Sequence, residues 1–109
     1  MTEPFIKDPQ ARLDYSLDWS AWLASGETIT ASTWAATTTG ITVESASPYA
    51  PSFTGTTTTV WLSGGTIGGG EEIGISRGVS QRAYRVTNTI TTSAGRTDER
   101  SIFVAVAER

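Results

Sequence analysis

The 109-residue sequence contains no cysteine and no histidine. The first absence excludes a disulfide framework and thiolate metal sites, and the second removes the commonest general base and metal ligand. No apolar run approaches the roughly 20 residues of a membrane-spanning helix, and the opening MTEPFIKDPQ lacks the apolar segment of a signal peptide. We therefore expect no cofactor, no metal, no membrane partner and no export by the general secretory route.

Charge and amino-acid usage narrow the class of protein further. A formal net charge of −3 provides no basic field to attract nucleic acid. Nothing in the sequence supplies a nucleophile with an adjacent base, so we do not expect an enzyme. Threonine forms runs at residues 37–39 and 56–59, and its β-branched side chain suits a half-exposed sheet. The composition indicates one all-β domain.

Alternating apolar and polar residues predict about seven strands. The first alternation places Leu13, Tyr15, Leu17 and Trp19 on one face, with Trp22 following. Further strands are predicted at residues 28–35, 41–44, 57–63, 81–92 and 96–107, which is typical of an immunoglobulin-like β-sandwich. The two sheets should share a core of Trp19, Val60, Leu62, Val86, Ile90, Ile102 and Val104. Asn88 also falls on the inward face and needs a polar partner there.

Two segments stand apart from this sandwich, which we expect at residues 13–109. Residues 1–12 contain Pro4 and Pro9 without alternation and predict an extended N-terminal arm. Its Phe5 and Ile6 either dock on a neighbouring chain or pack on their own domain. Residues 64–80 are rich in glycine, which predicts a loop that is mobile or becomes ordered against a partner. Three isoleucines of this loop have no evident core to enter: Ile67, Ile73 and Ile75.

Three groups of residues resemble chemical sites without matching one. Asp14 and Asp18 share a strand face about 13 Å apart, beyond the spacing of a glycosidase pair. Asp98 and Glu99 lack the ligand spacing of a calcium loop. The stretch GGTIGGGEE lacks the lysine and the following helix of a phosphate-binding loop. The carboxylate groups are better explained as solvent-exposed charges than as catalytic or metal sites. The glycine-rich stretch is better explained as a flexible connection than as a phosphate-binding loop.

Two features are candidates for contacts with other proteins. The charged residues after the last hairpin turn offer a docking surface, or they are ordinary charges on an exposed strand: Arg96, Asp98, Glu99 and Arg100. Trp61 faces away from Val60 and Leu62, so it either anchors an interface or packs in a core.

Three stretches of the chain resemble a family of short phage proteins encoded among virion structural genes. They are DPQARLDYSLDWSAWL, TVWLSGG and ITTSAGRTDERSIFVAVAE, and the likeness covers most of residues 8–108. Members are described as fiber–tail adaptor or neck-region structural proteins. The sequence departs from the family pattern between Leu62 and Tyr84, where residues 67–81 expand a compact hairpin.

The resemblance implies a structural virion protein that connects tail or portal-side components and seats a fiber. Its partners would be tail, portal-side adaptor or fiber subunits in a symmetric ring, assembled in the bacterial host cytoplasm. We expect the contacts at Pro4, Phe5, Ile6, Trp61, Ile67, Ile73, Ile75, Arg96, Asp98, Glu99 and Arg100. The alternatives are a capsid decoration protein of the same fold and a carbohydrate-binding module using Trp34, Tyr49 and Trp61. Removal of residues 1–9 should leave the fold almost unchanged and abolish incorporation into particles.

Overall fold

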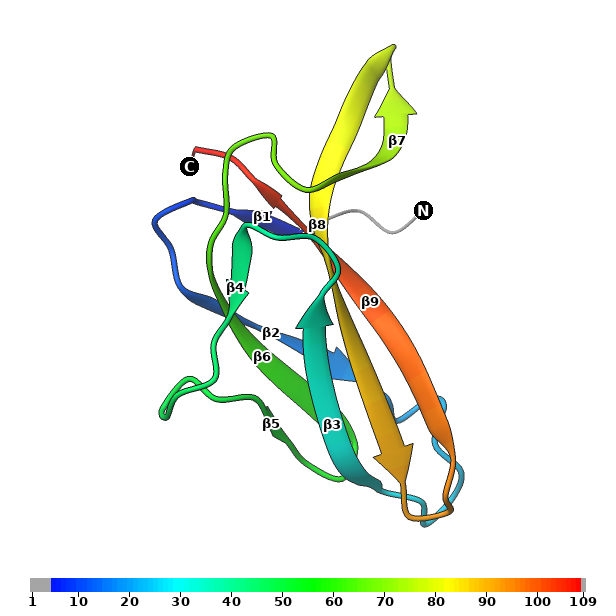
Figure 1. The fold of residues 1–109 in the computed structure, drawn as a ribbon. Helices are drawn as coiled ribbons and strands as arrows, with labels where there is room; N and C mark the ends of the chain where they lie inside the picture. Colours follow the sequence, from blue (N-terminus) through cyan, green and yellow to red (C-terminus); the bar gives the residue numbers. More distant parts are fainter. Residues whose placement is uncertain (1–4, 109) are drawn as a thin grey trace.

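The computed structural model describes residues 5–108, apart from the side chain of Ser76, as an all-β structure. Its strands are β1 (Phe5–Lys7), β2 (Leu13–Asp18), β3 (Ile29–Ala36), β4 (Ile41–Val43), β5 (Ser52–Phe53), β6 (Thr57–Gly64), β7 (Glu71–Ser76), β8 (Val79–Thr92) and β9 (Thr97–Val106). Figure 1 shows the β7–β8 hairpin standing out from the rest of the molecule at one end. Residues 5–108 include no helix with the length and apolar character to cross a membrane.

The strands form two sheets. The larger sheet has the order β1-β9-β8-β3, and β7 pairs with the first part of β8. The smaller sheet has the order β2-β6-β4, and β5 pairs with an earlier part of β6. β1 runs parallel to β9, and the remaining pairs are antiparallel. The predicted all-β fold in two sheets is therefore confirmed, with nine strands among the described residues where about seven were expected.

The predicted core is confirmed residue by residue. All seven side chains expected between the sheets are buried: Trp19, Val60, Leu62, Val86, Ile90, Ile102 and Val104. Tyr15 is buried as expected, but Leu13 is 39% exposed because it begins β2, an edge strand of the smaller sheet. The inward-facing side chains, which alternate with outward-facing ones along the long strands β8 and β9, form much of this core.

Asn88 has the polar partners that its inward position requires. Its Oδ1 accepts hydrogen bonds from Trp19 Nε1 at 3.1 Å and from Thr58 Oγ1 at 2.6 Å. Its Nδ2 donates to Ser32 Oγ and to the Thr33 carbonyl, both at 2.9 Å. One fully buried amide thus ties β8 and β3 of the larger sheet to β6 of the smaller one and to the segment after β2.

The N-terminal segment differs from the predicted arm, because residues 5–7 form β1 along β9. The Lys7 side chain is fully buried, and its Nζ donates to the carbonyls of Asp8 at 2.8 Å and Gly64 at 2.7 Å. Burial lowers the pKa of Lys7, and the nearby Asp8 carboxylate partly opposes that shift. This part of the chain therefore belongs to the sheet, and Pro4 lies outside the described residues.

Candidate functional site

The projecting hairpin occupies much of the segment expected to be a loop. Strand β7 and the first residues of β8 lie within residues 64–80, so the expectation of an irregular loop there is wrong for residues 71–76 and 79–80. A two-residue turn joins the strands, and both its residues, Arg77 and Gly78, have positive φ values of 54° and 75°. This turn matches the right-handed twist of paired strands and therefore favours a hairpin.

Glycines fix the base of the hairpin around Tyr84. The Tyr84 hydroxyl accepts a hydrogen bond from the Thr66 amide at 3.0 Å, and a Cβ on Gly69 would overlap this hydroxyl. A Cβ on Gly70 would likewise overlap the Ala83 carbonyl, and Gly70 has a φ of 95°. The glycines of this connection thus allow it to pass closely around a buried tyrosine and to begin β7 beside β8.

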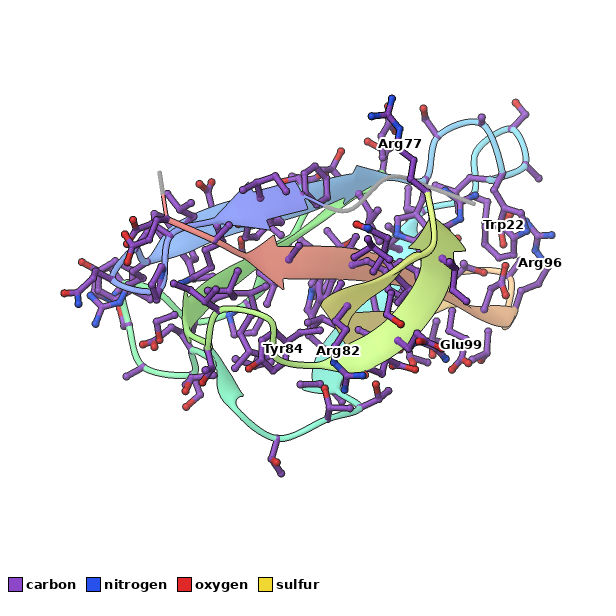
Figure 2. The ribbon with its side chains drawn as sticks, turned by 90° about the horizontal axis from the view of Figure 1, so that it is seen from above. Trp22, Arg77, Arg82, Tyr84, Arg96 and Glu99 are labelled. Atoms are coloured by element: carbon purple, nitrogen blue, oxygen red, sulfur yellow. The ribbon has the colours of Figure 1, made fainter. Side chains whose placement is uncertain are left out.

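The hairpin exposes a large apolar side chain on each face. Ile75 is 70% exposed and pairs with Ser80, whereas Val79 is 60% exposed and pairs with position 76. Successive residues of a strand point to opposite faces, so these two side chains face in opposite directions. Ile73 lies at a register shift in β7 and is half-buried. Figure 2 shows the hairpin from above, with Arg77 at its tip.

Three further apolar side chains are exposed near this end. Phe5 and Ile6 of β1 are 46% and 44% exposed, and the Phe5 ring lies 5.0 Å from the Tyr15 ring. Ile67 belongs to the β6–β7 connection and is also exposed. Lys7 ties β1 to the start of that connection through the Gly64 carbonyl. Exposed apolar side chains thus occur on β1, on the β6–β7 connection and on the hairpin, and Val79 joins the candidates named from the sequence.

Trp61 is half-buried on the outer face of the smaller sheet, beneath neighbouring side chains. The Tyr49 ring meets it edge to face at 5.1 Å, and the Arg12 guanidinium lies 4.2 Å above the Tyr49 ring. Trp34, by contrast, is buried in the core. The aromatic side chains proposed for a carbohydrate site therefore do not form an exposed row.

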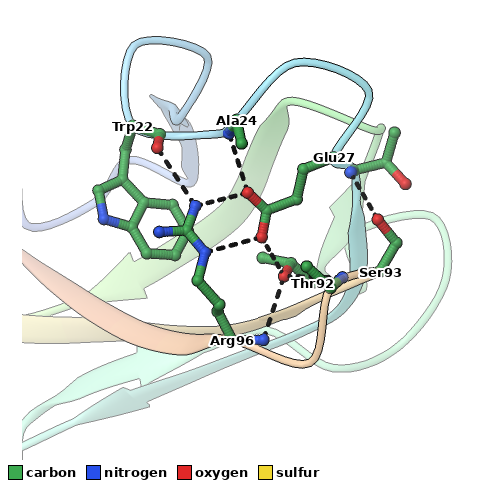
Figure 3. A network of polar contacts seen from close by, with 8 residues as sticks. Trp22, Ala24, Glu27, Thr92, Ser93 and Arg96 are labelled. Atoms are coloured by element: carbon green, nitrogen blue, oxygen red, sulfur yellow. Dashed lines mark hydrogen bonds and ion pairs between the residues drawn. The ribbon is translucent and has the colours of Figure 1, made fainter.

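Arg96 is engaged within its own chain at the far end of the sandwich. Its guanidinium donates to both carboxylate oxygens of Glu27, through Nε at 2.9 Å and Nη2 at 2.5 Å, and lies 4.0 Å from the Trp22 ring (Figure 3). Hydrogen bonds from Arg96, from the Thr92 hydroxyl and from the Ala24 amide lower the pKa of Glu27 to about 2. This cluster fastens the segment between β2 and β3 to the β8–β9 turn.

The other charged candidates do not form one patch with Arg96. Glu99 is exposed, while Asp98 and Arg100 alternate with it and point to the other side of β9. The Arg100 guanidinium lies 4.2 Å above the buried Trp19 ring and donates to the Asp18 carbonyl at 3.4 Å. Figure 2 shows Glu99 apart from the Trp22–Arg96 pair. Residues that are adjacent in the sequence therefore lie on opposite faces of β9, and the charged residues do not form one surface.

The described surface offers little for small-molecule chemistry. Residues 5–108 form no detectable pocket, and no three acidic side chains within them converge as a metal site would require. The notable surface features are instead the projecting hairpin and the apolar residues around it.

The family model described as "Podophage GP4 fiber-tail adaptor protein gp77" matches residues 7–105 of this chain. The chain belongs to this fiber–tail adaptor family. The adaptor is thus a structural component of the phage tail and the virion, and not an enzyme. Membership implies that it binds fiber and tail proteins, as the resemblance in the sequence predicted. A search of curated proteins found no match.

Proposed function

We propose that this adaptor holds its virion partners at opposite ends of the sandwich, and that the hairpin end is the principal docking surface. Of the seven large apolar side chains that are exposed within residues 5–108, five belong to β1, the β6–β7 connection or the hairpin: Phe5, Ile6, Ile67, Ile75 and Val79. These elements lie toward one end of the molecule in Figure 1. Full burial of one such side chain against a partner contributes roughly 1.5–3 kcal/mol, so this end suits stable attachment.

The opposite end suits a polar contact with the second partner. The Glu27–Arg96 pair and the Arg100–Trp19 contact hold its shape, and Glu99 is exposed on the outer face of β9. A surface that is already fixed by its own bonds loses little side-chain entropy on binding. We assign Arg96 and Arg100 to positioning this surface and Glu99 to the contact itself, whereas Asp98 lies on the other side of β9 and outside this contact.

The strand order supports an immunoglobulin-like sandwich as the scaffold between these ends. The order β2-β6-β4 corresponds to strands B, E and D of that fold, and β3-β8-β9 corresponds to C, F and G. In this correspondence β7 is an added strand between E and F. The expanded segment at residues 67–81 would then be a docking device specific to this sequence.

The assembly that we propose is a set of copies at equivalent positions around the rotationally symmetric tail, formed in the host cytoplasm. Closed symmetric arrangements are the usual form of homo-oligomers. A chain without cysteine is compatible with the reducing conditions of that compartment. Family membership favours this assembly over a capsid decoration protein.

Replacing the exposed apolar side chains of the hairpin by charged ones tests whether the hairpin end is the docking surface. A double variant, Ile75→Glu with Val79→Glu, changes only exposed positions and should keep the melting temperature of the parent. The matched control, Ala31→Glu with Thr33→Glu, places the same charge on exposed positions of β3. In phage that lack their own copy of the gene, we expect the control to enter particles and the hairpin variant to be absent. Normal incorporation of a folded hairpin variant would contradict the proposal.

A further inference from the structure

Both edges of the hairpin lack a neighbouring strand among the residues that the structure describes, and the β8 edge is the one without a register shift. β9 pairs with β8 only from Tyr84 onward, and β7 occupies the other side of residues 79–83. The side chains of residues 79–82 are all exposed. Proteins usually protect such an edge with lysine, proline or a bulge. In this hairpin the register shift lies on β7, between Glu72 and Gly74, and residues 79–83 of the open β8 edge contain no lysine, proline or bulge, with Arg82 as their one charged residue.

The direction of the main-chain groups along this edge follows from two observations. The pair formed by position 76 and Val79 flanks a two-residue turn, which places the Val79 amide and carbonyl toward β7. The Arg85 carbonyl accepts a hydrogen bond from the Thr37 amide on that same side. Alternation therefore directs the amides and carbonyls of Ser80 and Arg82 to the open side.

We infer that the open β8 edge pairs with the same edge of a second copy of this chain, in an antiparallel arrangement around a two-fold axis at Gln81. Ser80 would then lie opposite Arg82 of the second copy, and Arg82 opposite Ser80 of the second copy. Both pairs are formed by residues whose main-chain groups point outward, so four main-chain hydrogen bonds result. The two Gln81 residues form the pair between them, with Cα atoms about 4.5 Å apart.

The charged side chains favour pairing centred on Gln81 over pairing centred on the residue before or after it. The Ser80 hydroxyl donates to the Glu72 carboxylate at 2.5 Å, and the Arg82 guanidinium donates to the Gly70 carbonyl of its own chain. In the proposed pair, Arg82 of one copy lies opposite Ser80 of the other and would exchange that carbonyl for the Glu72 carboxylate of the other copy. A pairing centred on Arg82 would instead oppose two guanidinium groups. A pairing centred on Ser80 would reach only into the turn at residues 77–78. The edge is thus self-complementary in one register, as a two-fold interface requires.

This inference deepens the proposed docking role, because pairing along the edge leaves both faces of the hairpin open. Ile75 and Val79 stay exposed on opposite faces and remain accessible to a virion partner. The adaptor would then bind that partner as a pair of copies. The pairing of two copies is tested with the isolated chain, without any virion partner. Absence of a dimer would therefore not contradict the proposed docking role of the hairpin end.

Sedimentation of the full-length chain tests the pairing. A short interface of this kind is typical of weak association, so the concentration series should extend to about 1 mM. We expect a monomer–dimer equilibrium. Ser80→Pro removes an outward amide and should weaken dimerisation at least about tenfold, whereas Ser80→Ala retains that amide and should dimerise nearly like the parent. A monomer at every concentration would overturn the inference.

Charge exchange on the proposed axis provides a second test that does not depend on proline. Gln81→Lys or Gln81→Glu alone opposes two like charges and should weaken dimerisation by roughly fivefold. An equimolar mixture of the two variants opposes unlike charges and should restore dimers that contain one copy of each. Both variants change an exposed side chain and should fold normally. Equal dimerisation by each variant alone and by the mixture would overturn the two-fold axis at Gln81.

Discussion

Trp19 and Asn88 meet between the two sheets, where the indole Nε1 donates to the amide Oδ1 at 3.1 Å. Both side chains are fully buried, and they come from positions 69 residues apart in the chain. The same amide oxygen accepts from Thr58 of the facing sheet. This contact fixes how the two sheets of the adaptor align, because a buried polar group is stable only when its partners are in place.

Replacement of Asn88 should weaken the fold strongly. In Asn88→Ala, the Trp19 and Thr58 donors and the Thr33 carbonyl lose this partner, so we expect the free energy of unfolding to fall by about 2–4 kcal/mol. Denaturant unfolding measures this loss. Thr89→Ala, at the next and partly exposed position of β8, should change it by less than about 0.5 kcal/mol. Equal effects of the two substitutions would contradict the role assigned to Asn88.

The Glu27–Arg96 pair should make part of the stability dependent on pH. Arg96, Thr92 and the Ala24 amide hold the pKa of Glu27 at about 2, below its ordinary value of 4.5. A carboxylate with a lowered pKa in the folded state stabilises that state above its unfolded pKa, and the gain is lost as the pH falls toward the folded value. The difference in melting temperature between the parent and Glu27→Gln should therefore shrink from pH 5 to pH 2. A difference that stays constant over this range would exclude the mechanism.

Gly69 should tolerate a side chain better when the Tyr84 hydroxyl is removed. A Cβ on Gly69 would overlap that hydroxyl, so Gly69→Ala must displace either the connection or the tyrosine. We expect a loss of about 1–3 kcal/mol in the parent and a smaller loss in a Tyr84→Phe background. The double-mutant cycle of unfolding free energies isolates this coupling. Additive effects of the two substitutions would show that the close approach does not determine the conformation at the base of the hairpin.

Removal of residues 1–9 should destabilise the adaptor, in contrast to the expectation from sequence. The deletion takes away β1, the buried Lys7 and the hydrogen bond from the Ala107 amide to the Lys7 carbonyl. A loss of at least about 2 kcal/mol in unfolding free energy is expected. Phe5→Ser with Ile6→Ser retains the main-chain ladder and should cost less, so it separates folding from docking. A deletion that melts at the parent temperature would contradict the structural role of β1.

Regular alternation made most of this fold predictable. From Thr58 to Leu62 in β6 and from Ile102 to Val106 in β9, every second side chain is buried, and Val60, Leu62, Ile102 and Val104 could be assigned to the core directly. Asn88 could be recognised as an inward polar residue from its position in the same pattern. Its partners could not be named, because they come from strands that meet it only in the folded chain.

Local sequence pattern does not predict the structure at positions whose conformation depends on tertiary contacts. Glycines and the register shift at Ile73 interrupt the alternation of β7, so the hairpin and the exposure of Val79 were missed. The pair of residues with positive φ at Arg77 and Gly78 was not recognisable as a turn without its flanking strands. Lys7 is buried because its ammonium reaches the Gly64 carbonyl, 57 residues away, and no local signal predicts that contact.

A cryo-EM map of the intact particle would show whether the hairpin end contacts a virion partner. We expect density for this chain between the tail and the fiber, with Ile75, Val79 and the exposed residues of β1 buried against a neighbouring virion protein. Density at that place with the hairpin end in solvent would contradict the proposed docking surface. Density spread over the capsid lattice would contradict the adaptor role itself.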